Sequence, residues 1–421
     1  MATTTRAKAA TATPPAAPAA AGDRTARTNA GRAAAAAAET CALVLQGGGA
    51  LGSYQAGVYE QMDAHGLRPS WVAGVSIGAV NAAIIAGNPP ERRLARLHEF
   101  WDLVTSQLGW ITLPESFGNE AREWLSQTRA AAVALLGVPG FFQPRVPPAP
   151  LQPAGTRAAL SWYDTAPLAA TLERLIDFEL VNTRDARHKV RLSIGAVDVT
   201  SGNFRYFDSA RPDECGPIDV RHVMASGALP PGFAPVEIDG AWYWDGGLVS
   251  NTPLQYVIDQ PRERDLLVLQ VDLFSARGRM PRNLDDVAER EKDIRFASRT
   301  RLNTDRAARL HVLGATARRL AAKLPASMAN DPDLAELTRI GSPAALTILH
   351  LIYRSRQYES QSKDYEFSRQ TMQEHWREGA ADLRTSLAHP RWSTRRSTAG
   401  SLTVLDLTQP LEPRAHSGAA A

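Results

Sequence analysis

A serine between two glycines is the residue in this sequence best suited to nucleophilic chemistry. Ser76 lies in the pentapeptide GVSIG, flanked by Gly74 and Gly78, after the apolar residues 71–73 and before a second apolar run at 79–85. This order predicts a strand, a tight turn and a helix, in which the glycines let the backbone turn sharply and leave the hydroxyl exposed at the helix N-terminus. A serine in this position needs a base for its proton and N–H donors for an oxyanion, as in serine acyl hydrolases.

The N–H donors are expected in a glycine-rich turn. The sequence GGGALG follows a short apolar, strand-like segment at 41–46. Because glycine has no Cβ, such a backbone can approach a ligand closely and present N–H groups at the start of a helix. We expect Gly48 and Gly49 to be the main donors. The full candidate oxyanion-binding set is Gly47, Gly48, Gly49 and Gly52.

The same turn also matches the G-x-G-x-x-G pattern of dinucleotide-binding folds. That pattern calls for an acidic residue about 20 residues further on, at the end of the second strand, to bind the ribose. The second strand of this chain ends in residues 75–78 (VSIG), which include no acid. The nucleotide interpretation is therefore disfavoured, and we predict no cofactor.

Asp245 is the candidate proton acceptor. It follows a strand-like segment and precedes Gly246 and Gly247, which keep its surroundings open for a substrate and for Ser76. An aspartate normally titrates near pH ~4, so it can act as a base only if it is partly desolvated and the oxyanion donors stabilise the transition state. Taken alone, an Asp-Gly-Gly sequence is also typical of a tight surface turn.

A Ser-Asp-His triad on an α/β-hydrolase fold is the competing arrangement. His350, His375 and His389 follow the serine in the chain order that this fold requires. However, that fold places several strands before its nucleophile, and only the segment 41–46 precedes the strand that leads to Ser76. The position of the serine therefore favours a dyad with Asp245.

The alternation of elements around these motifs predicts the fold class. A strand at 41–46, a helix at 53–65, a strand ending at Ser76 and a helix ending near residue 87 are joined by short turns. This order indicates a parallel sheet covered by helices. From residue 285 onward the chain is charged and predicted to be helical. Further strand-like segments lie at 190–197, 203–207, 236–238, 242–244 and 266–271.

Composition narrows the functional classes. The 421 residues are 44% hydrophobic, enough to bury one large core or two moderate ones, and the formal net charge of +3 comes without a clustered basic face, which disfavours nucleic-acid binding. Cys41 and Cys215 are far apart, which indicates no disulfide framework and a reducing, cytoplasmic location. The histidines and cysteines lack metal-ligand spacing, and no apolar run is long enough to span a membrane, so we predict neither a metal site nor a spanning helix.

Four segments make up the predicted organisation. They are a disordered Ala/Pro-rich tail at 1–40, a catalytic domain at 41–275, a helical C-terminal region at 276–395 and a flexible tail at 396–421. Within the catalytic domain, the segment 104–160 interrupts the strand–helix alternation with an apolar stretch followed by a proline-rich one. It is either a core helix with a linker or a lid near the active-site mouth.

Three motifs in this order resemble those of the patatin-like phospholipases. They are GGGALG at 47–52, GVSIG at 74–78 and DGG at 245–247, supported by MASGALPPGF at 224–233 and NTP at 251–253. The resemblance covers about residues 41–275 and implies a three-layer α/β fold with a mainly parallel sheet between helices. It further implies that Ser76 is the nucleophile and Asp245 the proton acceptor in the hydrolysis of lipid acyl esters without a metal.

Two features qualify the resemblance. Many members carry Arg or Lys just before the last glycine of the first turn, where this chain has Leu51, so no positive charge near the oxyanion is expected from that residue. The segment 363–369 (KDYEFSR) resembles a C-terminal region appended in one bacterial subgroup. Its pattern indicates an amphipathic helix that packs on the protein, with a contact to a partner or a membrane as the alternative.

The predicted function is that of a lipid acyl hydrolase that uses a Ser-Asp dyad and an acyl-enzyme. The predicted partner is a lipid or acyl-ester substrate, with peripheral membrane contact as an open alternative. Two other interpretations remain: an esterase, thioesterase or acyltransferase that acts on a non-phospholipid acyl substrate, and a catalytically silent protein whose C-terminal region binds a partner.

Overall fold

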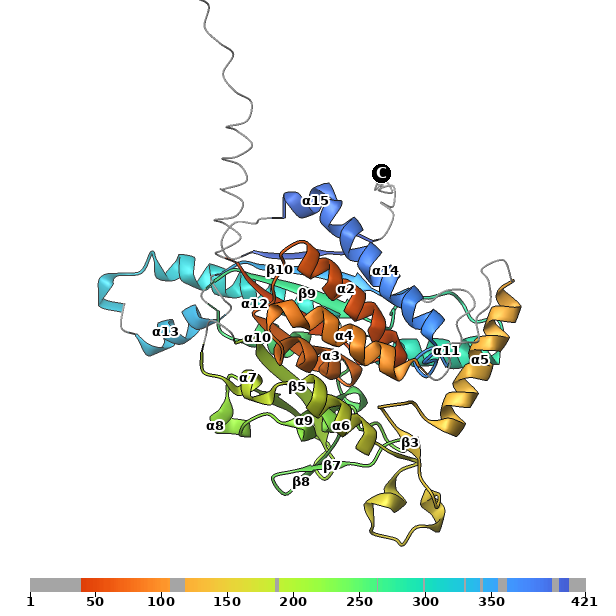
Figure 1. The fold of residues 1–421 in the computed structure, drawn as a ribbon. Helices are drawn as coiled ribbons and strands as arrows, with labels where there is room; N and C mark the ends of the chain where they lie inside the picture. Colours follow the sequence, from red (N-terminus) through yellow and green to blue (C-terminus); the bar gives the residue numbers. More distant parts are fainter. Residues whose placement is uncertain are drawn as a thin grey trace, which may run out of the picture. The chain divides into compact units, whose positions relative to one another are not determined.

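The computed structural model divides the chain into two units, residues 1–39 and 40–421, and the second unit is described below (Figure 1). The predicted N-terminal tail lies almost entirely outside the described residues, as do residues 107–117 of the segment 104–160. The described residues are 39–106, 118–185, 189–262, 264–297, 300–328, 331–340, 344–354, 362–395 and 401–408.

A sheet of mainly parallel strands forms the centre of this unit. Among the described residues its order is β11-β10-β9-β1-β2-β5-β8-β7, and β6 also pairs with β5. The parallel strands are β1 (Thr40–Leu45), β2 (Trp71–Val75), β5 (Arg191–Asp198), β9 (Leu266–Asp272), β10 (Leu346–Ile352) and β11 (Leu402–Leu405). The strands β6 (Phe204–Asp208), β7 (Val236–Ile238) and β8 (Ala241–Asp245) make antiparallel pairs, and β3 (Gln143–Pro144) pairs with β4 (Tyr163–Asp164) in a separate hairpin.

Helices cover the sheet and extend from it. The longer ones are α2 (Gly52–Ala64), α3 (Ile77–Ala86), α4 (Pro90–Val104), α5 (Asn119–Leu136), α6 (Ala166–Leu175), α11 (Leu284–Phe296), α12 (Thr300–Ala321) and α14 (Arg369–Ala388). The shorter ones are α7 (Phe178–Asn182), α8 (Pro212–Cys215), α9 (Val220–Ser226), α10 (Leu254–Asp259), α13 (Pro332–Arg339) and α15 (Pro390–Ser393). Single 3₁₀ turns follow two strands at η1 (Gly49–Leu51) and η4 (Gly246–Leu248).

Alternate side chains of the central strands face opposite helical layers. Leu43 and Leu45 of β1 belong to an apolar cluster that includes residues of α2, α3, α4 and α14. Ala42 and Val44 belong to a second cluster with α10, against which α12 packs. Because neighbouring strand residues point to opposite faces, this division places the sheet between two layers of helices. The predicted three-layer α/β fold is confirmed.

The C-terminal region differs from the expectation of helices alone. Residues 346–352 form β10, which pairs in parallel with β9, and residues 402–405, expected in a flexible tail, form β11 beside it. Most apolar side chains of the segment LTILHLI are buried. This segment forms a strand because β9, which is buried along its whole length, pairs with it from end to end. The region therefore extends the central sheet as well as adding helices.

The segment between α4 and β4 contains a long helix and a loop. Helix α5 buries Leu125, Ala130 and Val133, and the loop after it leads through β3 back to β4. Whether this segment acts as a lid stays a prediction. Within the described ranges, no helix combines the length and the apolar character needed to cross a bilayer.

Candidate active site

Ser76 occupies the sharp turn between β2 and α3, as the sequence predicts. Its backbone has φ 55° and ψ −128°, a conformation that a residue with a side chain rarely adopts. A Cβ at Gly74 would collide with the carbonyl oxygen of Gly78, and one at Gly78 would collide with that of Leu45. Only glycine therefore lets the strand, the turn and the end of β1 approach this closely, and the strained serine is characteristic of a nucleophile elbow.

Ser226, in the α9 segment, braces the elbow. Its hydroxyl oxygen accepts a hydrogen bond from the Ser76 backbone N–H at 2.9 Å, and its own proton is donated to the Gly195 carbonyl oxygen of β5 at 2.7 Å. Both Ser226 and Gly195 are buried in the core of the site. In the sequence, Ser226 stands out only as part of the motif at 224–233 and Gly195 does not stand out, because neither residue carries a local signal of function.

Asp245 is brought to the serine by the register of three strands. Strand β5 lies between β2 and β8, where Val75 pairs with Gly195 and Asp245 pairs with Ala196. The last residues of β2 and β8 therefore lie on either side of the same position in β5, at Gly195 and Ala196. Ser76 lies close enough to the Asp245 carboxyl group to favour its charged form, and both residues line the same cavity. The Gly247 N–H donates to Asp245 Oδ1 at 2.7 Å.

Burial dominates the electrostatics of this carboxyl group. Asp245 is 3% exposed. Desolvation by burial raises the pKa of Asp245 to about 7, although the hydrogen bonds from Ser76 and Gly247 act in the opposite direction. A surface Asp-Gly-Gly turn, the alternative from sequence, does not describe this position. Gly246 lies against the backbone of β5, and Gly247 is held by the carboxyl group itself.

The glycine-rich turn lies directly beside the serine. A Cβ at Gly47 would be 2.9 Å from Ser76 Cβ, so this approach needs a glycine. The N–H of Gly47 is bonded to the Asn251 carbonyl oxygen at 3.1 Å, and that of Gly52 to the carbonyl oxygen of Gly49. Across the described part of the chain, the N–H groups of Gly48 and Gly49 make no hydrogen bond. Of the four candidate donors, Gly47 and Gly52 therefore have N–H groups that are bonded within the chain, whereas the N–H groups of Gly48 and Gly49 are not.

Two amide side chains hold this turn in place. Gln46 Oε1 accepts from the backbone N–H groups of Leu273 at 2.6 Å and Phe274 at 2.9 Å, and its Nε2 donates to Thr252 Oγ1 at 2.8 Å. Asn251 Nδ2 donates to the Gly47 carbonyl oxygen at 3.0 Å. Gln46 was not predicted as a functional residue. The only signal for it in the sequence is that a polar residue ends a buried apolar strand.

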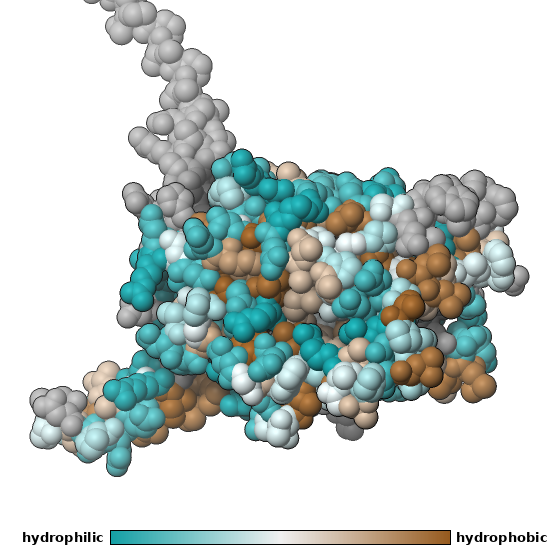
Figure 2. Space-filling view, turned by 60° about the horizontal axis from the view of Figure 1, so that its bottom comes forward, coloured by the Kyte–Doolittle hydropathy of each residue, from teal (hydrophilic) through white to brown (hydrophobic). Residues whose placement is uncertain are grey.

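A cavity of about 1410 Å³ opens at these residues. Its floor includes Ser76, Asp245 and the glycine-rich turn, and its walls come from α5, α11 and the segment 229–233. An aromatic cluster lines one side, in which the ring of Phe142 lies 5.3 Å from that of Phe233 and 4.8 Å from that of Tyr163. Figure 2 shows hydrophobic side chains gathered at the right-hand side of the face it presents. The cavity combines this aromatic side with polar and charged side chains elsewhere in its lining, including Glu291, Lys292 and Arg295 of α11, and it is large enough for a lipid acyl chain.

The C-terminal region contributes part of this wall. The Asp364 carbonyl oxygen accepts from the Ala50 N–H at 2.8 Å, and a Cβ at Gly49, which has φ +54°, would collide with the same oxygen. Next to it, Lys363 Nζ is buried between Asp293 at 2.7 Å and Glu289 at 3.0 Å of α11. Burial lowers the pKa of Lys363, but these two carboxylates outweigh it and raise the pKa above its ordinary value.

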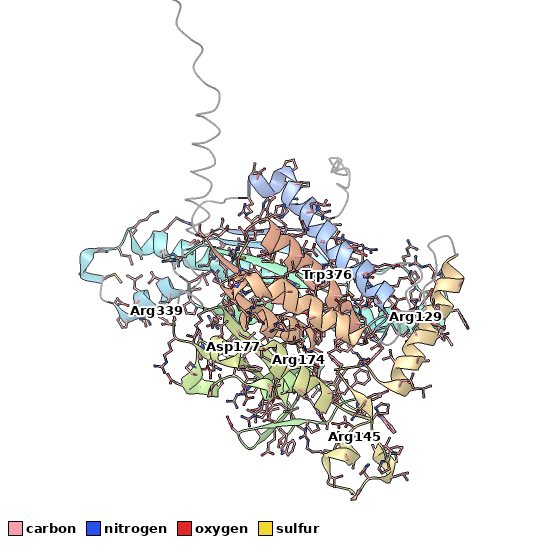
Figure 3. The ribbon with its side chains drawn as sticks, in the orientation of Figure 1. Arg129, Arg145, Arg174, Asp177, Arg339 and Trp376 are labelled. Carbon is pink, nitrogen blue, oxygen red and sulfur yellow. The ribbon has the colours of Figure 1, made fainter. Side chains whose placement is uncertain are left out.

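The same region also anchors α5. Arg129, labelled in Figure 3, extends from α5 to Ser368, with 3.2 Å between Nη1 and Oγ, and lies 3.7 Å from the buried carboxylate of Glu366. Arg122 pairs with Glu374 at 2.8 Å. The segment 363–369, expected to pack as a helix, is instead mostly a turn that precedes α14 and joins the glycine-rich turn, α5 and α11. Leu51, which replaces the basic residue of many relatives, is fully buried.

Comparisons with known proteins identify the family of this chain. A family model described as patatin-like phospholipase matches residues 43–258, and one described as patatin phospholipase matches residues 294–399. Among solved structures, VipD from Legionella pneumophila is 14% identical with a TM-score of 0.31, and the match covers 80% of this chain and 67% of that one. The ExoU-SpcU complex from the type III secretion system of Pseudomonas aeruginosa gives 15% identity and a TM-score of 0.27, with 71% of this chain and 58% of that one covered.

A comparison with curated proteins finds no match. The first family model spans half of the chain and includes all three motifs that carry the resemblance. The chain therefore belongs to the patatin-like phospholipase family and is a lipid acyl hydrolase.

Proposed function

We propose that this chain cleaves carboxylic esters of lipids through a Ser76–Asp245 dyad and a covalent acyl-enzyme. The observation that carries the proposal is the position of the elbow serine beside Asp245: the register of β2, β5 and β8 brings both into one cavity, where burial raises the pKa of Asp245 to about 7. A base with a pKa near neutrality combines a large deprotonated fraction with enough basicity to accept a hydroxyl proton in the transition state. An ordinary surface aspartate lacks that basicity.

In the first half of the reaction, Ser76 Oγ forms a bond to the ester carbonyl carbon while its proton moves to Asp245. The carbonyl oxygen becomes an oxyanion, to which the N–H groups of Gly48 and Gly49 donate. The tetrahedral intermediate then breaks its bond to the alcohol oxygen. Asp245 returns the proton to that oxygen, so the alcohol leaves neutral and the acyl group stays on Ser76.

In the second half, a water molecule attacks the acyl-enzyme carbonyl carbon and gives its proton to Asp245. The same two N–H groups bind the second oxyanion. Its collapse breaks the bond to Ser76 Oγ, which takes the proton back from Asp245 and releases the fatty acid. The apolar cavity walls, with Phe142 and Phe233, would receive the acyl chain.

Labelling with a fluorophosphonate probe tests the nucleophile. We expect the parent protein to be labelled and Ser76→Ala to be unlabelled, with Asp245→Asn labelled at least about a hundredfold more slowly because a general base contributes 10²–10⁴-fold. Ser393→Ala is the matched control, since Ser393 is an exposed serine of α15 outside the cavity lining. Equal labelling of Ser76→Ala and the parent would contradict the proposal.

A lipid substrate series tests the reaction itself. Fatty-acid release from phospholipid vesicles and from p-nitrophenyl esters of increasing chain length should depend on Ser76 in every case. Turnover of only short soluble esters, or of only thioesters, would be consistent with the dyad but would contradict a lipid ester as the substrate.

A further inference from the structure

Six exposed large apolar side chains lie on two loops that leave and rejoin the wall of the cavity. The first, residues 143–162, begins directly after Phe142 and ends directly before Tyr163, and both of these residues line the cavity. It exposes Val146 by 92%, together with Leu151 and Trp162. Hydrogen bonds hold its two ends together, including one from Arg145 Nε to Ser161 Oγ at 3.0 Å.

The second loop, residues 275–284, has the same relation to the cavity. It begins after Phe274 and ends before Asp285, which also line the wall. Met280 is 87% exposed and Leu284 is 85% exposed. Arg290 of α11 donates to the Ser275 carbonyl oxygen at 3.1 Å and so fixes the base of this loop to the helix. We call residues 143–162 and 275–284 the rim loops.

Two further exposed apolar segments line or adjoin the same cavity. Leu248 and Val249 line the cavity and are nevertheless about half exposed. Leu135 and Leu136 are exposed at the end of α5, directly after the cavity-lining Ala134. Large apolar side chains that are exposed around the mouth of one cavity are typical of an interaction site. This one is continuous with the cavity in which the acyl chain is placed.

The charge of the rim loops indicates the kind of surface they fit. They contain five arginines and no aspartate or glutamate, namely Arg145, Arg157, Arg277, Arg279 and Arg282. Arg282 pairs with Asp286 of α11 at 3.2 Å, and the loops remain positively charged with this pair counted. Apolar tips flanked by arginines match a bilayer with anionic headgroups, since the tips can enter the headgroup region while the guanidinium groups remain at the phosphates. Figure 3 labels Arg145 on the first rim loop, and the hydrophobic side of Figure 2 is the side on which Figure 1 draws α5 and this loop.

We propose that the rim loops dock the enzyme on an anionic lipid bilayer, with the cavity mouth facing the membrane. A lipid could then enter the cavity from the bilayer without crossing water. The inference rests on the proposed function only in taking the cavity as the place where the lipid reacts. Docking itself does not require catalysis, so binding can be measured in a Ser76→Ala background.

Vesicle co-sedimentation of the full chain tests the docking. The vesicles contain either phosphatidylcholine alone or phosphatidylcholine and phosphatidylglycerol in equal parts. We expect Ser76→Ala to bind the anionic vesicles, and Met280→Asp with Leu284→Asp, or Val146→Asp with Leu151→Asp, to weaken binding at least about tenfold because apolar burial is lost and negative charge added. Arg157→Gln with Arg279→Gln should weaken binding to the anionic vesicles and leave binding to phosphatidylcholine unchanged.

The matched control is Val312→Asp with Leu320→Asp on α12. Both residues are exposed, Arg318 and Arg319 are nearby in sequence, and no residue of α12 lines the cavity. Figure 1 draws α12 at the left and α5 at the right of the molecule. The control should bind vesicles like the Ser76→Ala parent. In the Ser76-containing protein, all of these variants should hydrolyse a water-soluble p-nitrophenyl ester at the parent rate, which shows that they are folded.

Rim-loop variants that bind anionic vesicles as tightly as the parent would overturn the docking proposal. A second outcome would also overturn it. If the rim-loop substitutions halve the molecular mass measured in solution, the apolar surface joins two copies of the chain instead of docking on a bilayer. The two proposals fail separately. Vesicle binding without any ester hydrolysis would contradict the proposed function alone, and hydrolysis with unaltered vesicle binding by the variants would contradict the docking alone.

Discussion

Replacing Asp245 by asparagine should make the enzyme inactive and, at alkaline pH, more stable. The folded protein holds the Asp245 proton with a pKa of about 7 because the carboxyl group is buried, whereas an unfolded chain releases it near pH ~4. Between these pH values the folded state binds more protons than the unfolded state. The free energy of unfolding therefore falls as the pH rises, and the stabilisation present below pH ~4 is lost by about pH 7.

The magnitude follows from the shift. One pKa unit corresponds to about 1.4 kcal/mol, so a rise from 3.8 to about 7 destabilises the protein at alkaline pH by about 4 kcal/mol. Roughly 3 kcal/mol of this falls between pH 5 and pH 8. Asparagine carries no charge at either pH and can still accept the Gly247 N–H. The stability of Asp245→Asn relative to the parent should therefore increase by about 3 kcal/mol from pH 5 to pH 8.

Urea unfolding followed by tryptophan fluorescence measures this difference. Other groups titrate alike in both proteins, so their contributions cancel. Asp213→Asn, at an exposed position of α8, is the matched control and should differ from the parent equally at both pH values. The reasoning is refuted if Asp245→Asn differs from the parent by the same amount at pH 5 and pH 8, because the carboxyl group would then titrate as it does in the unfolded chain.

Four further outcomes are expected. In the parent enzyme, kcat/KM for a soluble ester should rise about tenfold per pH unit up to about pH 7 and then level off, as Asp245 loses its proton; a flat profile from pH 5 to 8 would contradict its role as base. Gly49→Ala should lower stability by about 1–3 kcal/mol and reduce kcat, because φ is +54° and the Cβ meets the Asp364 carbonyl oxygen, whereas Gly202→Ala, with positive φ but open space, should leave kcat unchanged. Asn251→Ala should reduce kcat about tenfold with little change in KM, since it frees the glycine-rich turn; a rise in KM alone would contradict this. Lys363→Met should lower the free energy of unfolding by about 3–5 kcal/mol because the buried carboxylate of Asp293 loses the cation with which it pairs, in contrast to Lys323→Met at an exposed position.

The strand–turn–helix around Ser76 could be predicted because its signals are local. Apolar runs set β1, β2 and α3, and glycines mark the turns between them. The strands β10 and β11 were not predicted, because their short apolar runs lie in segments expected to be helical and flexible, respectively. They form strands only through the pairing of β10 with β9 and of β11 with β10. The contact of Asp364 with the glycine-rich turn likewise joins residues that have no relation in sequence.

The sequence by itself determined which residue types are present for the chemistry: a serine that only glycine neighbours allow to turn so sharply, a carboxylate before two glycines, and a turn rich in backbone donors. The tertiary structure alone decided that the serine and the carboxylate meet, because the register of β2, β5 and β8 sets their ends side by side. It also decided that the N–H groups of Gly47 and Gly52 are bonded within the chain while those of Gly48 and Gly49 are not. Finally, it raised the pKa of Asp245 to about 7, since only packing removes water from a carboxyl group.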